Sequence, residues 1–296
     1  TPATEASVSA IGSEDLRAFH AYALHPGNFV FAISGDVDTA AILGRLGSEL
    51  STWPAGEAPG AVPAPAVEPT PGLYLVDKAD VNQGRVSIGH LGSMQDNPDR
   101  YALMIMNHIL GGGGFTSRIM SRVRSDEGLA YSAGSGFGFG TYYPGDFRAF
   151  FQSRSNAVAR ATAIVLEEIE RIRTDPVSDE ELRNAKASFI DTFSRNFASP
   201  AQVAGLFANL ELVGRDPAYL QTYRDNLAAV TADDVTRVAQ EYLHPDRLMI
   251  LAVGNVEEIL AGDPDNPEFS LASMAPGGNV QRIPLPDPMT MQYPEQ

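Results

Sequence analysis

The amino-acid sequence predicts an α+β fold in which an antiparallel-rich sheet carries helices packed on one face. Most strand-like segments lie within residues 73–153, amphipathic helical segments dominate residues 156–242, and one helix–turn–strand pattern occurs twice. Strands that precede helices in this way are typical of a sheet with one covered face. A hydrophobic content of 44% and a charged content of 20% over 296 residues are ordinary for a globular protein with a sizeable core.

Charge and composition restrict the classes of partner. The formal net charge is −16 at pH 7, and a strongly acidic chain is repelled by nucleic-acid phosphates and anionic lipid. No apolar run approaches the roughly 20 residues that span a bilayer. We therefore expect no nucleic-acid partner and no membrane span.

An internal repeat defines the domain organisation. Residues 11–38 match residues 230–257 without a gap at a constant offset of 219, and Leu24-His25-Pro26 falls on Leu243-His244-Pro245. Each copy predicts a capped helix, a turn at His-Pro, a strand (residues 29–34 and 248–253) and a glycine exit. Because a repeat copy normally completes a unit, we expect residues 1–53 to be the C-terminal remnant of a first, similar domain.

The rest of the chain then divides in three. Residues 54–72 form a proline-rich linker, residues 73–260 a second domain, and residues 261–296 an extended tail without periodicity. The patterns in the second domain predict strands at 73–76, 83–91, around Tyr131 and at 146–153, and helices at 98–110, from Thr116 or Ser117 to Gly128, at 156–173, after a capping box at Ser178, and near Pro200 and Pro217.

The most informative segment is LGGGGFTSRIMSRVRSDEGLAYS, residues 110–132. Its four glycines, Gly111, Gly112, Gly113 and Gly114, interrupt one helix, and Gly128 ends the next. Arg124 then lies in the last turn of that second helix and Tyr131 on the strand that follows.

These two residue types suit peptide chemistry. A guanidinium donates in a fixed fork to carbonyl or carboxylate oxygens, and a phenol donates to an oxyanion. The alternative is structural, because an arginine favours a helix C-terminus and a tyrosine packs. A nucleotide site is excluded by context: no Lys-Ser/Thr follows the glycines, and a helix rather than a strand precedes them.

The segment resembles the LGGG-SRL-LRE-GLAYS signature in the C-terminal half of the pitrilysin/insulinase family of zinc metallopeptidases, which includes the mitochondrial processing peptidases. The resemblance implies that Arg124 and Tyr131 reach across a closed chamber to substrate bound at zinc in the other half, beside a substrate loop at Gly111 to Gly114. It also implies two similar α+β domains per half-molecule and a processing-peptidase-like fold.

The family's zinc motif, H-x-x-E-H, is absent from this sequence. The histidines are His20, His25, His90, His108 and His244, and no two of them have the required spacing with an intervening glutamate. Aligned on the family's zinc helix, the ligand and base positions fall on Ala102, Ile105 and Met106, which cannot hold zinc. We therefore expect this chain to bind no metal or other cofactor, and expect zinc in the complementary half.

Two functions remain open at this stage. In the first, the chain is the non-catalytic, substrate-binding half of a zinc endopeptidase, inactive alone, with a zinc-bearing domain or subunit and peptide substrates as its partners. In the second, it is an inert structural or interaction protein of the same fold, similar to the family members that serve as core subunits of respiratory complexes. Because a structural copy has no need of Arg124 with Tyr131, the first is favoured.

Overall fold

The computed structural model describes residues 3–57, 60, 62–65 and 68–294. Contacts divide the chain into two compact units. The first unit comprises Thr1–Pro63, Asp191–Tyr223 and Pro286–Tyr293, and the second comprises Ala64–Ile190, Arg224–Leu285 and Pro294–Gln296. Each unit is described by itself. The second unit holds the sheet and all of the predicted site residues.

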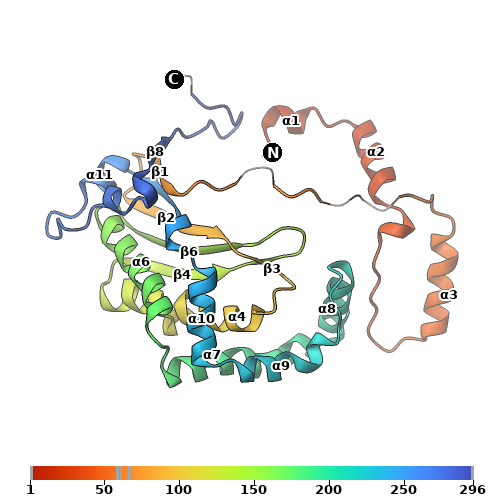
Figure 1. Cartoon of the computed structure of the whole chain (residues 1–296). Coiled ribbons are helices and arrows are strands. Elements are labelled where there is room, and N and C mark those ends of the chain that lie inside the picture. Colours follow the sequence, from red (N-terminus) through yellow and green to blue (C-terminus); the bar gives the residue numbers. More distant parts are fainter. Residues whose placement is uncertain (1–2, 58–59, 61, 66–67, 295–296) are drawn as a thin grey trace. The chain divides into compact units, whose positions relative to one another are not determined.

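A six-stranded sheet with the order β4-β6-β2-β7-β1-β8 forms the centre of the second unit (Figure 1). Its strands are β1 (Gly72–Asp77), β2 (Gln83–Leu91), β4 (Ala130–Phe137), β6 (Asp146–Arg154), β7 (Met249–Gly254) and β8 (Val280–Ile283). The β2–β6, β2–β7 and β4–β6 pairs are antiparallel, whereas β1 pairs in parallel with β7 and β8. A separate short parallel pair joins β3 (Ser93–Met94) to β5 (Phe139–Gly140). The predicted antiparallel-rich α+β fold is confirmed.

Helices cover one face of this sheet. Along β6, exposed and buried residues alternate strictly, and the buried set includes Phe147 and Phe151. Figure 1 shows α4 (Arg100–Asn107), α6 (Val158–Thr174) and α10 (Ala232–Tyr242) on the same side of the strands. Helix α6 buries Val158, Val165 and Ile169, which recur at helical spacing. The core therefore lies between these helices and one sheet face.

The remaining helices follow the sequence signals closely. The predicted capping box opens α7 (Asp179–Thr192), where the Glu181 amide donates to Ser178 Oγ and the Ser178 amide donates to Glu181 Oε2. Helix α8 (Pro200–Leu212) starts at Pro200, and α9 (Tyr219–Ala229) starts two residues after Pro217. Short helices follow β7: α11 (Val256–Ala261) and the 3₁₀ turns Leu271–Met274 and Pro276–Gly278.

The two copies of the internal repeat have the same helix boundaries. Helix α2 (Ser13–Ala23) and α10 start and end 219 residues apart, as do the 3₁₀ turns Pro26–Asn28 and Pro245–Arg247. In each copy a backbone amide at the helix start donates to an aspartate three residues later, from Gly12 to Asp15 and from Thr231 to Asp234, both at 2.9 Å. The repeat is therefore present in the structure of these helices and turns as well as in the sequence.

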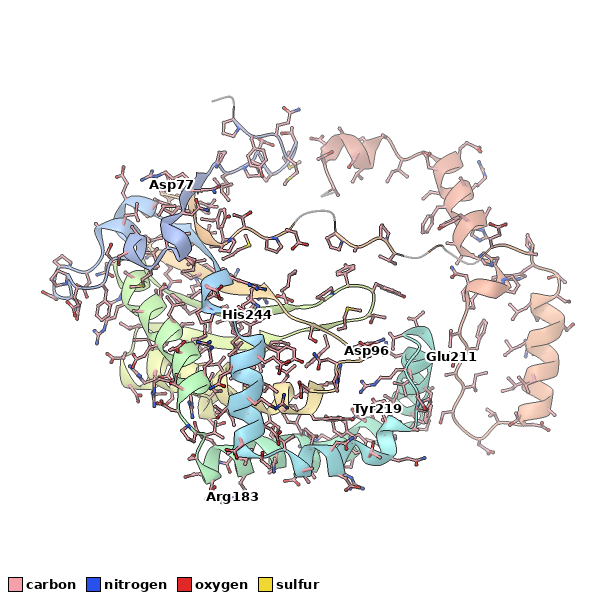
Figure 2. The ribbon with its side chains drawn as sticks, in the orientation of Figure 1. Asp77, Asp96, Arg183, Glu211, Tyr219 and His244 are labelled. Atoms are coloured by element: carbon pink, nitrogen blue, oxygen red, sulfur yellow. The ribbon has the colours of Figure 1, made fainter. Side chains whose placement is uncertain are left out.

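The second copy is joined to the sheet by a hydrogen bond to His90 of β2. His244 follows α10 and lies between that helix and the strands (Figure 2). Its amide donates to His90 Nε2 at 3.1 Å, while His90 Nδ1 lies 2.7 Å from the Leu91 carbonyl oxygen. These two contacts fix the neutral tautomer with the proton on Nδ1, and burial accordingly lowers the pKa of His90.

The predicted strand at residues 29–34 does not form. The first copy contains α1 (Glu5–Ser9), α2 and α3 (Thr39–Leu50), but residues 29–34 are in no strand. Its counterpart β7 pairs with β1 on one side and β2 on the other. Within the described residues, the first copy has no such neighbours, so the same sequence pattern lacks partners for its backbone N–H and C=O groups.

Part of the predicted tail joins the sheet. Residues 261–296 are predicted to be an extended tail, but β8 within them pairs with the outer edge of β1. The Leu73 amide donates to the Asn279 carbonyl at 2.8 Å, and Asn279 Nδ2 donates to the Pro71 carbonyl. A four-residue edge strand with mostly exposed side chains has too few residues to show periodicity. In the described part of the chain, no helix is long and apolar enough to cross a membrane.

Candidate functional site

The glycine loop begins where α4 packs against β4. After Asn107 the helix widens into a π-helix (His108–Gly112), and a Cβ built on Gly111 would lie 2.3 Å from the Ser135 backbone nitrogen. Asn107 and Ser135 join the two elements, since Ser135 Oγ donates to Asn107 Oδ1 at 2.8 Å. Gly111 therefore permits a close helix–strand approach that no other residue allows.

The loop then turns sharply to the next helix. Gly114 has φ +60°, in the left-handed region, and opens a 3₁₀ turn (Gly114–Thr116). Ser117 occupies the N-cap position of this helix, but its hydroxyl donates backwards to the Gly114 carbonyl at 2.7 Å instead of capping the helix. The Thr116 hydroxyl likewise donates to the Gly113 carbonyl at 3.0 Å. The turn is thus fixed by its own side chains.

Residues 118–126, which we call the signature helix, carry three arginines. Helix α5 (Arg118–Met120) continues as a π-helix (Ser121–Asp126), which ends at Gly128 with φ +64° as predicted. The Gly128 amide donates to the Arg124 carbonyl, and the Leu129 amide to the Val123 carbonyl. The widened turns were not predicted, and π-helical turns occur frequently at functional sites.

Two of these arginines anchor the helix to its neighbours. Arg118 binds Glu181 of α7 in a bidentate manner, with Nε–Oε1 at 2.6 Å and Nη2–Oε2 at 3.1 Å. Arg122 reaches α6, with Nη1 at 2.8 Å from Glu168 Oε1 and Nη2 at 3.2 Å from Glu167 Oε2. Glu168 is fully buried and also accepts from Arg171. Such planar, charge-assisted contacts fix rotation of the signature helix about its axis.

The ion pair with Arg118 also affects the pKa of Glu181. Burial alone would raise the pKa of Glu181, but the hydrogen bonds from Arg118 and Ser178 outweigh it and lower the pKa to about 2. The ionised carboxylate is therefore the form that stabilises the fold.

Arg124 and Tyr131, the two predicted site residues, lie together. The guanidinium carbon of Arg124 is 4.8 Å from the centroid of the Tyr131 ring. Tyr131 is 82% exposed and sits at a register shift between Ala130 and Ser132, where β4 has one residue more than β6. Such a bulge re-aims a side chain away from the regular strand direction. Among the described residues, no carboxylate forms an ion pair with Arg124.

One member of the cluster was missed in the sequence. The Phe115 ring lies 4.7 Å from the same guanidinium carbon and is 68% exposed. Its position directly after the glycine run was the only signal available. The site therefore consists of two exposed aromatic rings beside a cation that forms no ion pair with any carboxylate that the structure describes.

The positions that correspond to zinc ligands belong to the core. Ala102, Ile105 and Met106 are buried on α4 and have no group that ligates zinc. In the described residues, no three His, Cys, Asp or Glu side chains come together to hold a metal. The side chains at these positions do not fit a zinc site.

Comparison with known families settles the relationship of the chain. Residues 10–189 match the family model described as the peptidase M16 inactive domain. This chain belongs to the peptidase M16 family. The predicted family resemblance is confirmed, and the M16 inactive domain forms part of zinc-protease-like proteins.

Individual relatives agree with this. The chain is 24% identical over 245 residues to an uncharacterized zinc protease of Streptomyces coelicolor. The matched region covers 80% of this chain and 52% of the relative. The chain is 29% identical over 244 residues to an uncharacterized zinc protease of Mycobacterium tuberculosis, and this match covers 80% of this chain and 54% of the relative. The chain thus spans about half the length of these curated relatives.

Solved structures share the fold. A peptidase M16 inactive domain from Pseudomonas fluorescens superposes with a TM-score of 0.75 at 27% identity, covering 84% of this chain and 59% of that one. A protease from Helicobacter pylori gives a TM-score of 0.69 at 23% identity, covering 84% and 60%. A chain of Complex III2 from Candida albicans, at 18% identity, gives 0.67, covering 93% and 64%. The latter two show likeness of fold alone.

The contact at Gly111 yields a prediction about this M16 domain. Gly111→Ala places a methyl group against the β4 backbone, which cannot yield as a flexible side chain would, and should lower the free energy of unfolding by about 1–3 kcal/mol. Gly136→Ala on the same strand meets nothing within 4 Å and should change it by less than about 0.5 kcal/mol. Urea unfolding of both variants tests this. Equal stabilities would show that the close approach is not a constraint.

The anchor at Glu181 yields a second prediction, on pH. Glu181→Gln should lower the free energy of unfolding by about 1–3 kcal/mol at pH 7. Because the folded pKa is about 2, below the ordinary glutamate value of 4.5, wild type has the full stabilisation above pH 4.5 and loses it as the pH falls towards 2. The difference between the proteins should shrink over this window. The exposed neighbour Glu180 provides the control variant Glu180→Gln, and a pH-independent difference contradicts the assignment.

Proposed function

We propose that this chain is the non-catalytic, substrate-binding part of a zinc endopeptidase, and that Arg124 and Tyr131 contact the peptide. The observation that carries the proposal is the contrast within the signature helix. Arg118 and Arg122 are bound to carboxylates, whereas Arg124 has no such partner among the described residues and lies beside an exposed phenol. An arginine held in place and left available is arranged to bind a ligand.

The chemistry of the two groups fits a peptide. The fork of N–H donors on Arg124 suits a backbone carbonyl or a carboxylate. The Tyr131 hydroxyl suits the oxygen that becomes negative as a peptide carbonyl is attacked, where a positioned donor has its largest effect. Gly111 to Gly114 would border the bound peptide.

The zinc in this proposal belongs to a complementary half. Ala102, Ile105 and Met106 cannot ligate it, so a zinc-bearing peptidase domain or subunit must complete the chamber. The length of the relatives, about twice the matched region, supports a second half of similar size.

The first copy of the repeat supports the same arrangement. We propose that residues 1–53 close a preceding domain similar to the second one, with residues 54–72 as the linker. On α10 the residues Val235 and Val238 are buried, whereas Leu16 and Phe19, 219 positions earlier, are 62% and 67% exposed. The apolar residues of α2 therefore call for packing partners in that preceding domain, such as those that α10 has in α4 and α6.

The proposal predicts a loss of rate without unfolding when the pair is changed. In a protein that includes a zinc-bearing half, Tyr131→Phe should lower peptide turnover by about 10²-fold, since it removes one oxyanion donor and little volume. Arg124→Ala should raise KM more than Tyr131→Phe does, because it removes the cation that holds the peptide. Steady-state kinetics with thermal melts measure both effects.

The matched control is Tyr142→Phe, which removes a hydroxyl from another exposed tyrosine of the second unit. Its kinetics should equal wild type. Wild-type activity in both Tyr131→Phe and Arg124→Ala would instead favour the second candidate function, an inert structural protein of the same fold.

A further inference from the structure

Phe115 has no part in the core, and its exposure needs another explanation. The second unit buries Phe147 and Phe151 completely, whereas Phe115 leaves 68% of its surface in water. Its ring contacts the Arg124 guanidinium, as does the ring of Tyr131. Three side chains from the glycine loop, the signature helix and β4 therefore meet at one exposed point.

The position of the Phe115 ring is set by the turn that carries it. The buried Ser117 side chain and the Ser117 amide both contact the Gly114 carbonyl, at 2.7 and 3.0 Å. The left-handed backbone at Gly114 fixes the direction in which the chain leaves the loop. Phe115 is thus held between two constrained residues and directed at Arg124, although it is exposed.

Two aromatic contacts restrain Arg124 without neutralising it. A ring face attracts the cation through its quadrupole and does not consume the N–H donors in the way a carboxylate does. Arg118 and Arg122, by contrast, have donors engaged with glutamates. The rings thus limit the orientations of the guanidinium while its in-plane donors remain available to a ligand.

We propose that Phe115 is a positioning residue for Arg124 and the apolar part of the same subsite. The ring orients the guanidinium, and its exposed face packs against the ligand. The subsite then selects a peptide segment in which a carbonyl or carboxylate oxygen lies next to a large apolar side chain. The positioning role stands on the geometry alone, whereas the peptide preference rests on the proposed function.

Nuclear magnetic resonance of the arginine side chains tests the positioning role in the free protein. The Arg124 Nε–Hε resonance, assigned by its loss in Arg124→Lys, should shift towards the value of a solvated arginine in Phe115→Leu. Phe115→Tyr should retain the wild-type shift, because a ring is still present. Thermal melts of both variants report that the fold is intact.

The control is a second phenylalanine–arginine contact in the same unit. The guanidinium carbon of Arg148 lies 5.7 Å from the Phe150 ring centroid. Phe150→Leu should move the Arg148 resonance and leave that of Arg124 in place. If Phe115→Leu leaves the Arg124 resonance unchanged, or if Phe115→Tyr shifts it as much as Phe115→Leu does, the positioning role is overturned.

Peptide binding tests the preference. Fluorescence anisotropy should be measured with labelled peptides that differ by leucine or glycine beside one acidic residue, in a protein that includes a zinc-bearing half with its general base removed. Wild type should prefer the leucine peptide, and in Phe115→Ala that preference should fall by about 2- to 5-fold, which corresponds to about 20–40 Å² of apolar surface no longer buried. An unchanged preference overturns this part of the inference. If wild type binds neither peptide, the proposed function fails, while the resonance experiment still decides the role of Phe115.

Discussion

The arrangement of the site depends on the ion pairs that hold the signature helix against α6 and α7. A nine-residue helix between the glycine loop and Gly128 has little stability of its own. Arg118 bound to Glu181 and Arg122 bound to the buried Glu168 supply the tertiary contacts that fix its position and rotation. Arg124 lies two residues beyond Arg122 on the same helix, so its location follows from theirs. Glu168 of α6 and Glu181 of α7 are thus structural supports for Arg124, which forms an ion pair with neither of them.

Much of the fold was predictable from the sequence, because it rests on long periodic segments. Strand β2 has the predicted bounds, and α6 and α7 begin within two residues of their predicted starts, where alternation, helical spacing and a capping box act over many residues. Arg124 and Tyr131 were placed on the correct elements for the same reason: Gly128 ends one element and the small and aromatic residues after it begin another.

The differences arise where non-local contacts decide the structure. The segment 29–34 has the same strand pattern as β7 but no neighbouring strand in the part of the chain that the structure describes, and β8 has a neighbour but almost no pattern. A helix that widens to a π-turn over six residues has nearly the same apolar spacing as an α-helix, so Ser121–Asp126 was not distinguishable. Phe115 was missed because its role lies in a contact with Arg124, nine residues away, across a turn whose geometry Ser117 sets through a hydrogen bond.

The central claim, that this surface receives peptide, is tested most directly by photo-crosslinking. p-Benzoylphenylalanine would replace Tyr131 in one protein and the exposed Tyr142 in another, each combined with a zinc-bearing half whose general base has been removed. Irradiation with a labelled peptide should label the protein at position 131 and not at position 142, and excess unlabelled peptide should suppress that labelling. Equal labelling at both positions, or none at position 131 while the peptide is bound, would contradict the account.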